Sequence, residues 1–230
     1  MVRIDVLTLF PAMIEGFIQG SIVGRAQHDR IVSIQLHDFR TFSPDKHLKV
    51  DDTPYGGGAG MVLRVEPIVY ALRSIDGYQN AHKILLTPQG EPYHQGQAQQ
   101  LSQHDHLILI CGHYEGFDER IRHYIDQEIS IGDYILTGGE AAAMIVIESV
   151  VRLIPGVLHN ADSAVEETFS EDLLEYPHYT KPIVFEEHEV PEILRSGHHE
   201  NIRLWRREQQ LKRTEKRRPD LYRNYLKKQR

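Results

Sequence analysis

The chain has 230 residues, of which 40% are hydrophobic and 26% are charged, which is typical of a soluble globular protein with one large domain or a large and a small one. Its apolar runs are too short to cross a bilayer, and its first residues lack the features of a signal peptide, so we expect no membrane association. The single cysteine excludes an internal disulfide and indicates a reducing compartment, which we take to be the cytoplasm.

The net charge of −7 is unevenly distributed along the chain. Residues 195–230 contain 13 Lys and Arg against 4 Asp and Glu, so this segment carries +9 and the rest carries −16. A basic tail on an acidic body is compatible with two interpretations. One is a polyanionic partner such as a nucleic acid, and the other is a set of solvated helix faces.

The first half of the chain alternates predicted strands and helices. Residues 1–10 alternate in polarity as a strand does, and Pro11 ends them. Further strands are predicted at residues 31–36 and 83–86, and helices at residues 13–22 and 65–75. This alternation favours an α/β fold with a parallel sheet.

The segment 107–156 contains the clearest pattern. An apolar run at residues 107–111 ends at Gly112, a second apolar patch covers residues 129–136, and Gly138-Gly139 closes it. A helix-compatible piece at residues 118–124 separates them, and a mostly apolar helix is predicted from residue 140 to residue 153. Short apolar runs bounded by glycine are typical of buried parallel strands.

Three glycine-bearing loops follow directly on apolar runs of this predicted sheet. They contain Thr87-Pro88-Gln89-Gly90, Gly112 and Gly138-Gly139. Because ligands bind beyond the carboxyl ends of parallel strands, we expect the three loops to converge on one nucleoside-sized site. Residues 112–119 hold no Lys or Arg, and no phosphate-binding glycine motif follows a strand. The acidic loops suit a nucleoside without phosphates, including one with a positive charge, although such charges are also common on solvated loops.

Two further segments each allow two interpretations. Residues 51–60, DDTPYGGGAG, form either a flexible connector or a lid that faces a substrate. Residues 157–176 are acidic and form either a solvated linker or a source of a general base.

Cys111 is either a nucleophile or, as is more usual for a cysteine that ends an apolar strand, a small core residue. The 14 histidines show no metal-ligand spacing, so no metal site is predicted.

The C-terminal region predicts a small helical domain. Residues 190–196 form a short helix with Gly197 as its C-cap, and Asn201 is expected to cap a second helix that ends near residue 218. Pro219 begins a last helix.

Motifs throughout the chain resemble the bacterial tRNA (guanine-N1)-methyltransferases of the SPOUT class, the TrmD family. The sequences that carry the resemblance are DVLTLFPAM at 5–13, DDTPYGGGAGMVL at 51–63, LTPQG at 86–90, CGHYEGFDER at 111–120, SIGDYILTGGE at 130–140, RLIPGVL at 152–158, LLEYPHYTKP at 173–182 and LRSGHHENIRLWR at 194–206. Together and in this order they are specific.

The resemblance implies a parallel sheet with a C-terminal trefoil knot, followed by a small all-helical domain. The implied division is a knotted catalytic domain at 1–158, a linker at 159–176 and a basic tRNA-binding domain at 177–230. The residues alone would have predicted an ordinary open sheet, because knots are rare. The resemblance further implies a homodimer with its active site at the subunit interface. The cofactor would be S-adenosylmethionine and the substrate a tRNA, methylated on N1 of the guanosine 3′ to the anticodon, position 37.

The resemblance also carries site residues over to this sequence. The cofactor would be bound by Leu86, Thr87, Pro88, Gly112, Tyr114, Glu115, Gly116, Ile131, Gly132, Asp133, Tyr134, Ile135, Leu136, Gly138 and Gly139. The substrate would contact Asp51, Tyr55, Gly58, Arg203 and Arg206. These cofactor positions include the three glycine loops identified from the residues alone.

Two catalytic residues follow from the same resemblance. Arg152 would stabilise charge that builds on guanine O6, and Glu167 would remove the proton from N1. The family has an aspartate in a motif like EDSF where this chain reads Glu166-Glu167-Thr168-Phe169, and glutamate reaches one methylene further. Alternatives to Glu167 are Glu166 and Asp162. Rival functions are a SPOUT methyltransferase that acts on ribosomal RNA or a ribose hydroxyl, and a non-catalytic RNA-binding relative that keeps the cofactor site.

Overall fold

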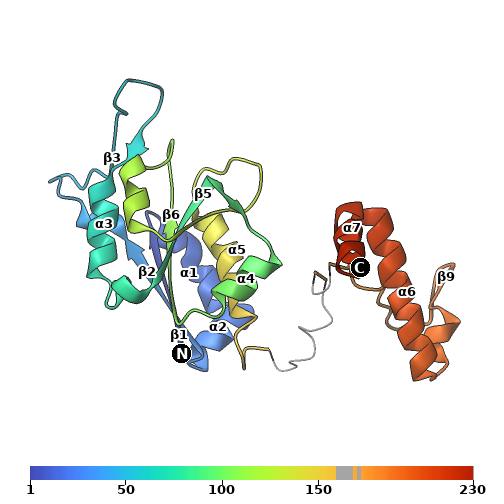
Figure 1. Cartoon of the computed structure of the whole chain (residues 1–230). Helices are drawn as coiled ribbons and strands as arrows, with labels where there is room; N and C mark the ends of the chain where they lie inside the picture. The colour runs from blue at the N-terminus through green and yellow to red at the C-terminus, as the bar shows by residue number, and fades with distance from the viewer. Residues whose placement is uncertain (159–167, 170–171, 230) are drawn as a thin grey trace. The chain divides into compact units, whose positions relative to one another are not determined.

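The computed structural model describes residues 1–158, 168–169 and 172–229. The chain divides into two compact units, Met1–His159 and Asn160–Arg230 (Figure 1). Each unit is described by itself below. None of the described helices is long and apolar enough to span a membrane.

The N-terminal unit is built on a five-stranded parallel sheet. Its strands, in spatial order, are β2 (Val32–Asp38), β1 (Val2–Thr8), β6 (His106–Cys111), β5 (His82–Pro92) and β7 (Gln127–Ser130). All four neighbouring pairs are parallel. The predicted α/β class with a parallel sheet is therefore confirmed.

Helices cover both faces of this sheet (Figure 1). One face packs against α1 (Pro11–Gln19), α2 (Ser21–His28), α4 (Gln95–Leu101) and α5 (Glu140–Val151). The other face packs against α3 (Val65–Ser74) and the 3₁₀ turns η1 (Phe39–Phe42) and η3 (Glu119–Tyr124). A third 3₁₀ turn, η2 (Tyr78–Asn80), leads into β5, and a short hairpin joins β3 (Asp51–Asp52) to β4 (Val62–Leu63).

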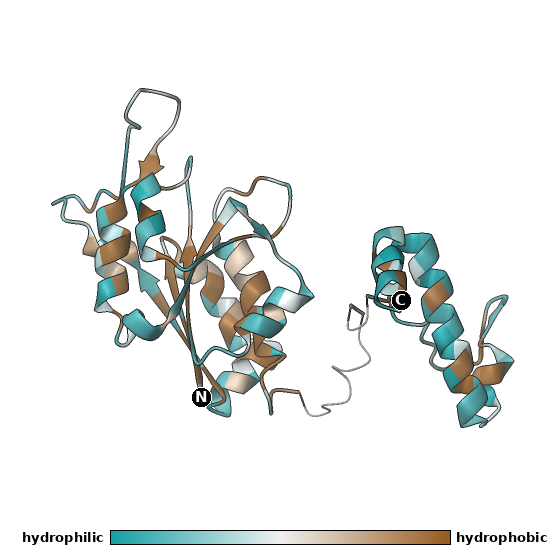
Figure 2. Cartoon of the chain, in the orientation of Figure 1, coloured by the Kyte–Doolittle hydropathy of each residue, from teal (hydrophilic) through white to brown (hydrophobic). Residues whose placement is uncertain are grey.

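The strands divide their side chains between the two cores because successive residues point to opposite faces. On β6, Leu107 and Leu109 pack on the α5 side, whereas Ile108 and Ile110 pack on the α3 side. All four are essentially fully buried, so the strand appears in the sequence as an unbroken apolar run. Figure 2 shows this hydrophobic interior under more hydrophilic outer surfaces.

Three predicted elements of the N-terminal unit differ from the observed ones. The single helix predicted at residues 13–22 is two helices, because Gly20 between them is extended with φ −94° and ψ 163°. The piece predicted to be helical at residues 118–124 is the 3₁₀ turn η3. The apolar patch at residues 129–136 is strand only as far as Ser130, and Gly132, with φ 150°, adopts a conformation that favours glycine and lies outside the strand.

The C-terminal unit contains α6 (His199–Arg217), α7 (Pro219–Lys228), the 3₁₀ turn η5 (Glu192–Arg195) and a hairpin of β8 (Val184–Phe185) and β9 (His188–Glu189). The hairpin was not predicted, and the short helix predicted at residues 190–196 is the 3₁₀ turn η5. The predicted cap Asn201 is wrong, because the amide of Ile202 already donates to the carbonyl of His198, so the helix begins at His199. Pro219 does begin the last helix.

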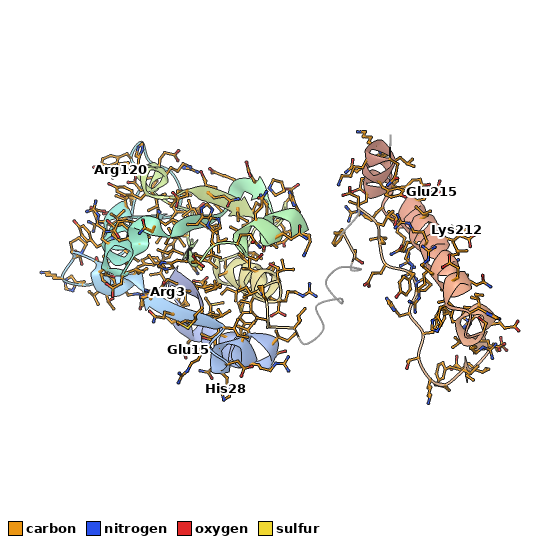
Figure 3. All side chains as sticks on the ribbon, turned by 60° about the horizontal axis from the view of Figure 1, so that its bottom comes forward. Arg3, Glu15, His28, Arg120, Lys212 and Glu215 are labelled. Atoms are coloured by element: carbon orange, nitrogen blue, oxygen red, sulfur yellow. The ribbon has the colours of Figure 1, made fainter. Side chains whose placement is uncertain are left out.

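Few side chains of α6 are buried. Thr214 is fully buried, and its hydroxyl oxygen accepts a hydrogen bond of 2.8 Å from the amide of Leu174. This contact ties the segment before the hairpin to the C-terminal turn of α6. Other positions are exposed, such as Lys212 (Figure 3). Lys212 forms an ion pair of 2.6 Å with Glu208.

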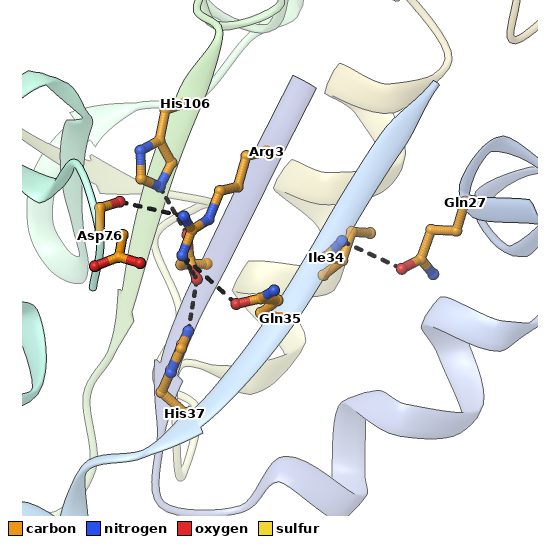
Figure 4. Close-up of polar contacts among 8 residues, drawn as sticks. Arg3, Gln27, Ile34, Gln35, His37, Asp76 and His106 are labelled. Carbon is orange, nitrogen blue, oxygen red and sulfur yellow. Dashed lines mark hydrogen bonds and ion pairs between the residues drawn. The ribbon is translucent and has the colours of Figure 1, made fainter. Parts of the chain in front are cut away.

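A buried carboxylate joins three strands of the sheet. Asp5 on β1 is completely buried and accepts hydrogen bonds of 2.6 Å from His37 on β2 and 2.7 Å from His106 on β6. Arg3 forms an ion pair of 2.7 Å with the same carboxylate, and Figure 4 shows these side chains converging. Burial alone would raise the pKa of Asp5, but the hydrogen bonds from His37, Arg3 and His106 outweigh it and lower the pKa.

We expect Asp5→Asn to lower the free energy of unfolding of the N-terminal unit by about 3 kcal/mol at pH 7, because it removes the partner of several donors in a buried cluster. Urea unfolding followed by far-UV circular dichroism measures this loss. Trp205, the one tryptophan of the chain, lies on α6, so its fluorescence provides an internal control that the substitution should leave unchanged.

The same variant has a predicted pH dependence. The pKa of Asp5 is lower in the folded protein than in the unfolded chain, where it is about 3.9. The Asp5 carboxylate therefore contributes its full stabilisation above about pH 5. This stabilisation is lost as the pH falls through the unfolded value toward the lower folded one. The difference between wild type and Asp5→Asn should therefore shrink below about pH 4. A difference that stays constant from pH 7 to pH 3 would contradict the role given to Asp5.

Candidate functional site

A cavity of about 490 Å³ lies at the carboxyl ends of β6 and β7 and beside an irregular part of β5. This volume is in the range of small-molecule sites. The register of the sheet explains its position, because Leu86 of β5 lies opposite both Cys111 of β6 and Ile129 of β7. The chain segments that follow these three residues therefore leave the sheet at the same level and surround one space.

The first wall of the cavity is a loop within β5. Pairing with β7 is interrupted between Leu86 and Glu91, and residues 87–90 bulge out of the strand. A Cβ on Gly90 would stand 2.4 Å from the amide nitrogen of Ile129. Glycine at this position lets the bulge return close against the neighbouring strand.

The second wall is the segment that follows β6, the third is the segment that follows β7, and the two are hydrogen-bonded to each other. The amide of Gly139 donates a hydrogen bond of 2.8 Å to the carbonyl of Gly112, and His113 forms an antiparallel bridge with Gly138. A Cβ on Gly139 would lie 2.8 Å from the Cα of Cys111. The two loops are packed backbone to backbone, which only glycine permits.

The structure brings together nearly all the residues predicted to bind the cofactor. Those that line the cavity are Leu86, Thr87, Pro88, Gly112, Tyr114, Glu115, Gly116, Ile131, Gly132, Tyr134, Ile135, Leu136, Gly138 and Gly139. The exception is Asp133, which is exposed and does not line it.

Several lining residues were not predicted. They are Gln89, Phe117, Glu119, Arg122, Ile129, Ser130, Thr137 and Ala142, whereas His113, which also lines the cavity, lies within the segment 112–116 that the resemblance assigns to the cofactor. Most are direct sequence neighbours of predicted positions, so their place in the motifs was the available signal. Arg122 is different, because it comes from η3, six residues after Gly116.

Arg122 changes the expectation that the cavity lacks cationic side chains. That expectation considered only residues 112–119. The guanidinium donates hydrogen bonds of 2.8 Å to Glu128 and of 2.8 Å to Gln89, and it forms an ion pair with Glu119. Its charge is therefore balanced by two carboxylates, and the guanidinium links η3, β7 and the bulge of β5.

Three of the residues predicted to contact the substrate belong to the N-terminal unit, and none of the three lines the cavity. Asp51 begins β3, while Tyr55 and Gly58 lie in the loop of the β3–β4 hairpin, where the side chain of Tyr55 is fully exposed. The same hairpin reaches the cavity wall through its far end, because the amide of Glu115 donates to the carbonyl of Met61 at 3.0 Å.

Of the two predicted catalytic residues, one is described. Arg152 is the C-cap of α5, whereas the cavity is lined by Gly139 and Ala142 at the opposite end of that helix. Glu167 and its alternatives Glu166 and Asp162 lie outside the described residues.

Cys111 is 1% exposed at the end of β6. Burial, and after it the nearby Glu140 carboxylate, raises the pKa of the Cys111 thiol well above its usual range. The thiol therefore stays protonated, which favours the core interpretation over the nucleophile. Within the described parts of the chain, no three His, Cys, Asp or Glu side chains are grouped closely enough to hold a metal ion.

The basic residues singled out in the C-terminal unit both lie on α6. Arg203 pairs with Glu200 at 2.7 Å, and the guanidinium of Arg206 stacks 4.6 Å from the centre of the Tyr176 ring. An arginine over an aromatic ring keeps its charge while one planar face is covered.

The family described as tRNA (Guanine-1)-methyltransferase TrmD matches residues 2–224. The chain belongs to this family. It is 57% identical over 220 residues to the tRNA (guanine-N(1)-)-methyltransferase of Brevibacillus brevis, with 95% of this chain and 90% of the relative covered. The enzymes of the same name from Clostridium botulinum and Geobacillus kaustophilus are 55% and 56% identical, with 97% of this chain and 94% and 92% of the relatives covered.

We expect Gly139→Ala to lower the free energy of unfolding by about 1–3 kcal/mol, because the new methyl group meets the backbone at Cys111 and Gly112. The matched control is Gly16→Ala in α1, where a Cβ meets nothing within 4 Å. The control should be neutral or stabilising by up to about 1 kcal/mol. Denaturant unfolding of both variants tests the close approach, and equal stabilities would contradict it.

Proposed function

We propose that this TrmD-family protein transfers a methyl group from S-adenosylmethionine to N1 of the guanosine 3′ to the anticodon, position 37, of tRNA. The observation that carries the proposal is the single cavity shared by Thr87, Gly112 and Gly138. The names of the relatives support the type of reaction.

The cavity fits an adenosine donor that has a positive sulfonium and no phosphate. Its walls are largely backbone at Gly112, Gly138 and Gly139, whose N–H and C=O groups suit the edges of a nucleoside. Glu115 and Glu119 contribute negative charge, and the one arginine of its described lining, Arg122, is already paired. A triphosphate or dinucleotide would lack compensating cations here.

When bound, S-adenosylmethionine supplies an electrophilic methyl group. Guanine N1 carries a proton at neutral pH, so a carboxylate must accept that proton for N1 to attack. We assign this role to Glu167. Negative charge then develops toward O6, where the guanidinium of Arg152 stabilises it.

The position of Arg152 supports an active site shared between two copies of the chain. The twelve residues of α5 span about 18 Å, so Arg152 is far from the cavity that the other end of the same helix lines. We therefore propose a homodimer in which Arg152 of one chain serves the cavity of its partner. Hydrophobic side chains exposed on α1 and α5, such as Met13 and Ile145, are compatible with a covered surface.

We also propose the trefoil knot that the family resemblance implies, and a cytoplasmic location. In such a knot, the second and third loops of the site would pack against each other where the chain crosses itself. The hydrogen bond from the amide of Gly139 to the carbonyl of Gly112 is compatible with this packing. The basic helical unit is proposed to hold the tRNA through its phosphates, with Arg203 and Arg206 on α6 among the contacts. Asp51, Tyr55 and Gly58 would face the target nucleotide.

Methyl transfer from labelled S-adenosylmethionine to an unmodified tRNA transcript tests the proposed function. We expect label at position 37 as 1-methylguanosine, and none on a matched transcript with adenosine at that position. Label on ribosomal RNA or on a ribose hydroxyl would replace the proposal with another SPOUT activity. Cofactor binding without any transfer would favour a non-catalytic relative.

Substitutions of the two catalytic candidates should separate their roles from binding. We expect Arg152→Ala and Glu167→Ala to lower the single-turnover rate by about 100-fold or more. Arg152→Lys and Glu167→Gln are the size-matched controls, and tRNA affinity should change little in all four. Near-normal rates in both Glu167 variants would remove it from the mechanism and transfer the role of base to Glu166 or Asp162.

A further inference from the structure

Among the buried polar atoms of the described N-terminal unit that lack a hydrogen-bond partner, two belong to residues beside Gly138. They are Nδ1 of His113 and Oε2 of Glu140. A Cβ built on Gly138 would lie 2.4 Å from Oε2 of Glu140 and 2.8 Å from Cδ2 of His113. The carboxylate and the imidazole therefore meet in the space that the missing side chain of Gly138 leaves open.

Glu140 is an unusual side chain for its position. It is the first residue of α5 and is 1% exposed. Its other oxygen, Oε1, accepts a hydrogen bond of 2.6 Å from the hydroxyl of Thr8, and the Thr8 oxygen in turn accepts one of 2.9 Å from the amide of Phe10. A carboxylate oxygen that loses water without gaining a donor is costly, so a donor for Oε2 is expected nearby.

His113 can provide that donor. A rotation of its ring by 180° about the Cβ–Cγ bond exchanges Nδ1 with Cδ2, which places Nδ1 beside Gly138. The two orientations have nearly the same shape, so the packing of the ring against Phe10 and Tyr114, at 5.0 and 5.1 Å between centroids, does not choose between them. The hydrogen bonds of the His113 ring therefore decide its orientation.

We propose that the Nδ1–H group of His113 donates to Oε2 of Glu140, which makes Glu140 a positioning residue for an imidazole in the cavity wall. The chain Thr8–Glu140–His113 then connects the end of β1, the start of α5 and the loop after β6. With the proton held on Nδ1, Nε2 of the neutral ring is a hydrogen-bond acceptor. The Cys111 thiol, on which this carboxylate acts, stays protonated and supplies no competing charge.

The pair also explains why the third loop contains glycine at residue 138. A side chain there would occupy the place where Glu140 and His113 meet, since both groups lie within 3 Å of its Cβ position. The consequence for catalysis rests on the proposed function, because it assumes that the cavity holds the cofactor and that a displaced wall misplaces the methyl group.

The tautomer of His113 provides a test that does not depend on activity. Long-range ¹H–¹⁵N correlation spectra of the full protein with ¹⁵N-labelled histidine should show His113 as the Nδ1–H tautomer, with its signals assigned by their loss in His113→Asn. Glu140→Gln should move the ring to the Nε2–H tautomer, and Glu15→Gln, at an exposed glutamate of α1, should not. A wild-type Nε2–H tautomer would overturn the proposal.

Kinetics test the positioning role. We expect Glu140→Gln to lower kcat for methyl transfer about tenfold or more while KM for tRNA changes little. Thr8→Val should follow it in the same direction, and Thr8→Ser, which keeps the hydroxyl, should retain most of the rate. A normal kcat in Glu140→Gln would overturn the role. A wild type without any methyl transfer would refute the proposed function instead, and the tautomer experiment would still decide the pairing.

Discussion

The register of three parallel strands is the constraint on which the site depends. Leu86 is paired with Cys111 on one side and with Ile129 on the other, so the three chains leave the sheet at one level. Had any one strand slipped by one residue, its apolar side chains would have exchanged faces. The two separate cores on the two faces of the sheet forbid that slip. Burial of the strands therefore fixes the position of the loops.

The loops themselves are held by contacts between backbones rather than between long side chains. Gly90 and Gly139 each lie where a Cβ would come within 3 Å of a backbone atom, and Gly112 lies where a Cβ would come within 3 Å of the Phe117 ring. Such a wall presents N–H and C=O groups to a ligand with little side-chain freedom to lose on binding. The arginine in the cavity lining is paired with carboxylates. Arg122 is balanced by Glu119 and Glu128, which leaves the wall without a free cation of its own in the described residues.

The helix α5 separates two tasks. Its first turn carries Glu140 and lines the cavity through Ala142, and its C-cap is Arg152. A rigid helix cannot bring its two ends together, so the proposed chemistry needs a second copy of the chain.

In the C-terminal unit, the buried Thr214 fixes Leu174 against α6. Thr168 and Phe169 directly follow the proposed base Glu167 in the sequence. They shortly precede Leu174, which is hydrogen-bonded to α6.

The sequence by itself determined the parallel sheet, the extent of most helices and the three loops of the site, because buried strands and glycine turns leave a local pattern. The predicted helix at residues 140–153 is Glu140–Val151, for example. Only the tertiary structure decided which distant side chains join these loops. Arg122 bonds Gln89, 33 residues away, and Thr8 bonds Glu140, 132 residues away. Such contacts depend on strand order and register, which no local pattern records, and the start of α6 at His199 was likewise decided by bonding that composition does not show.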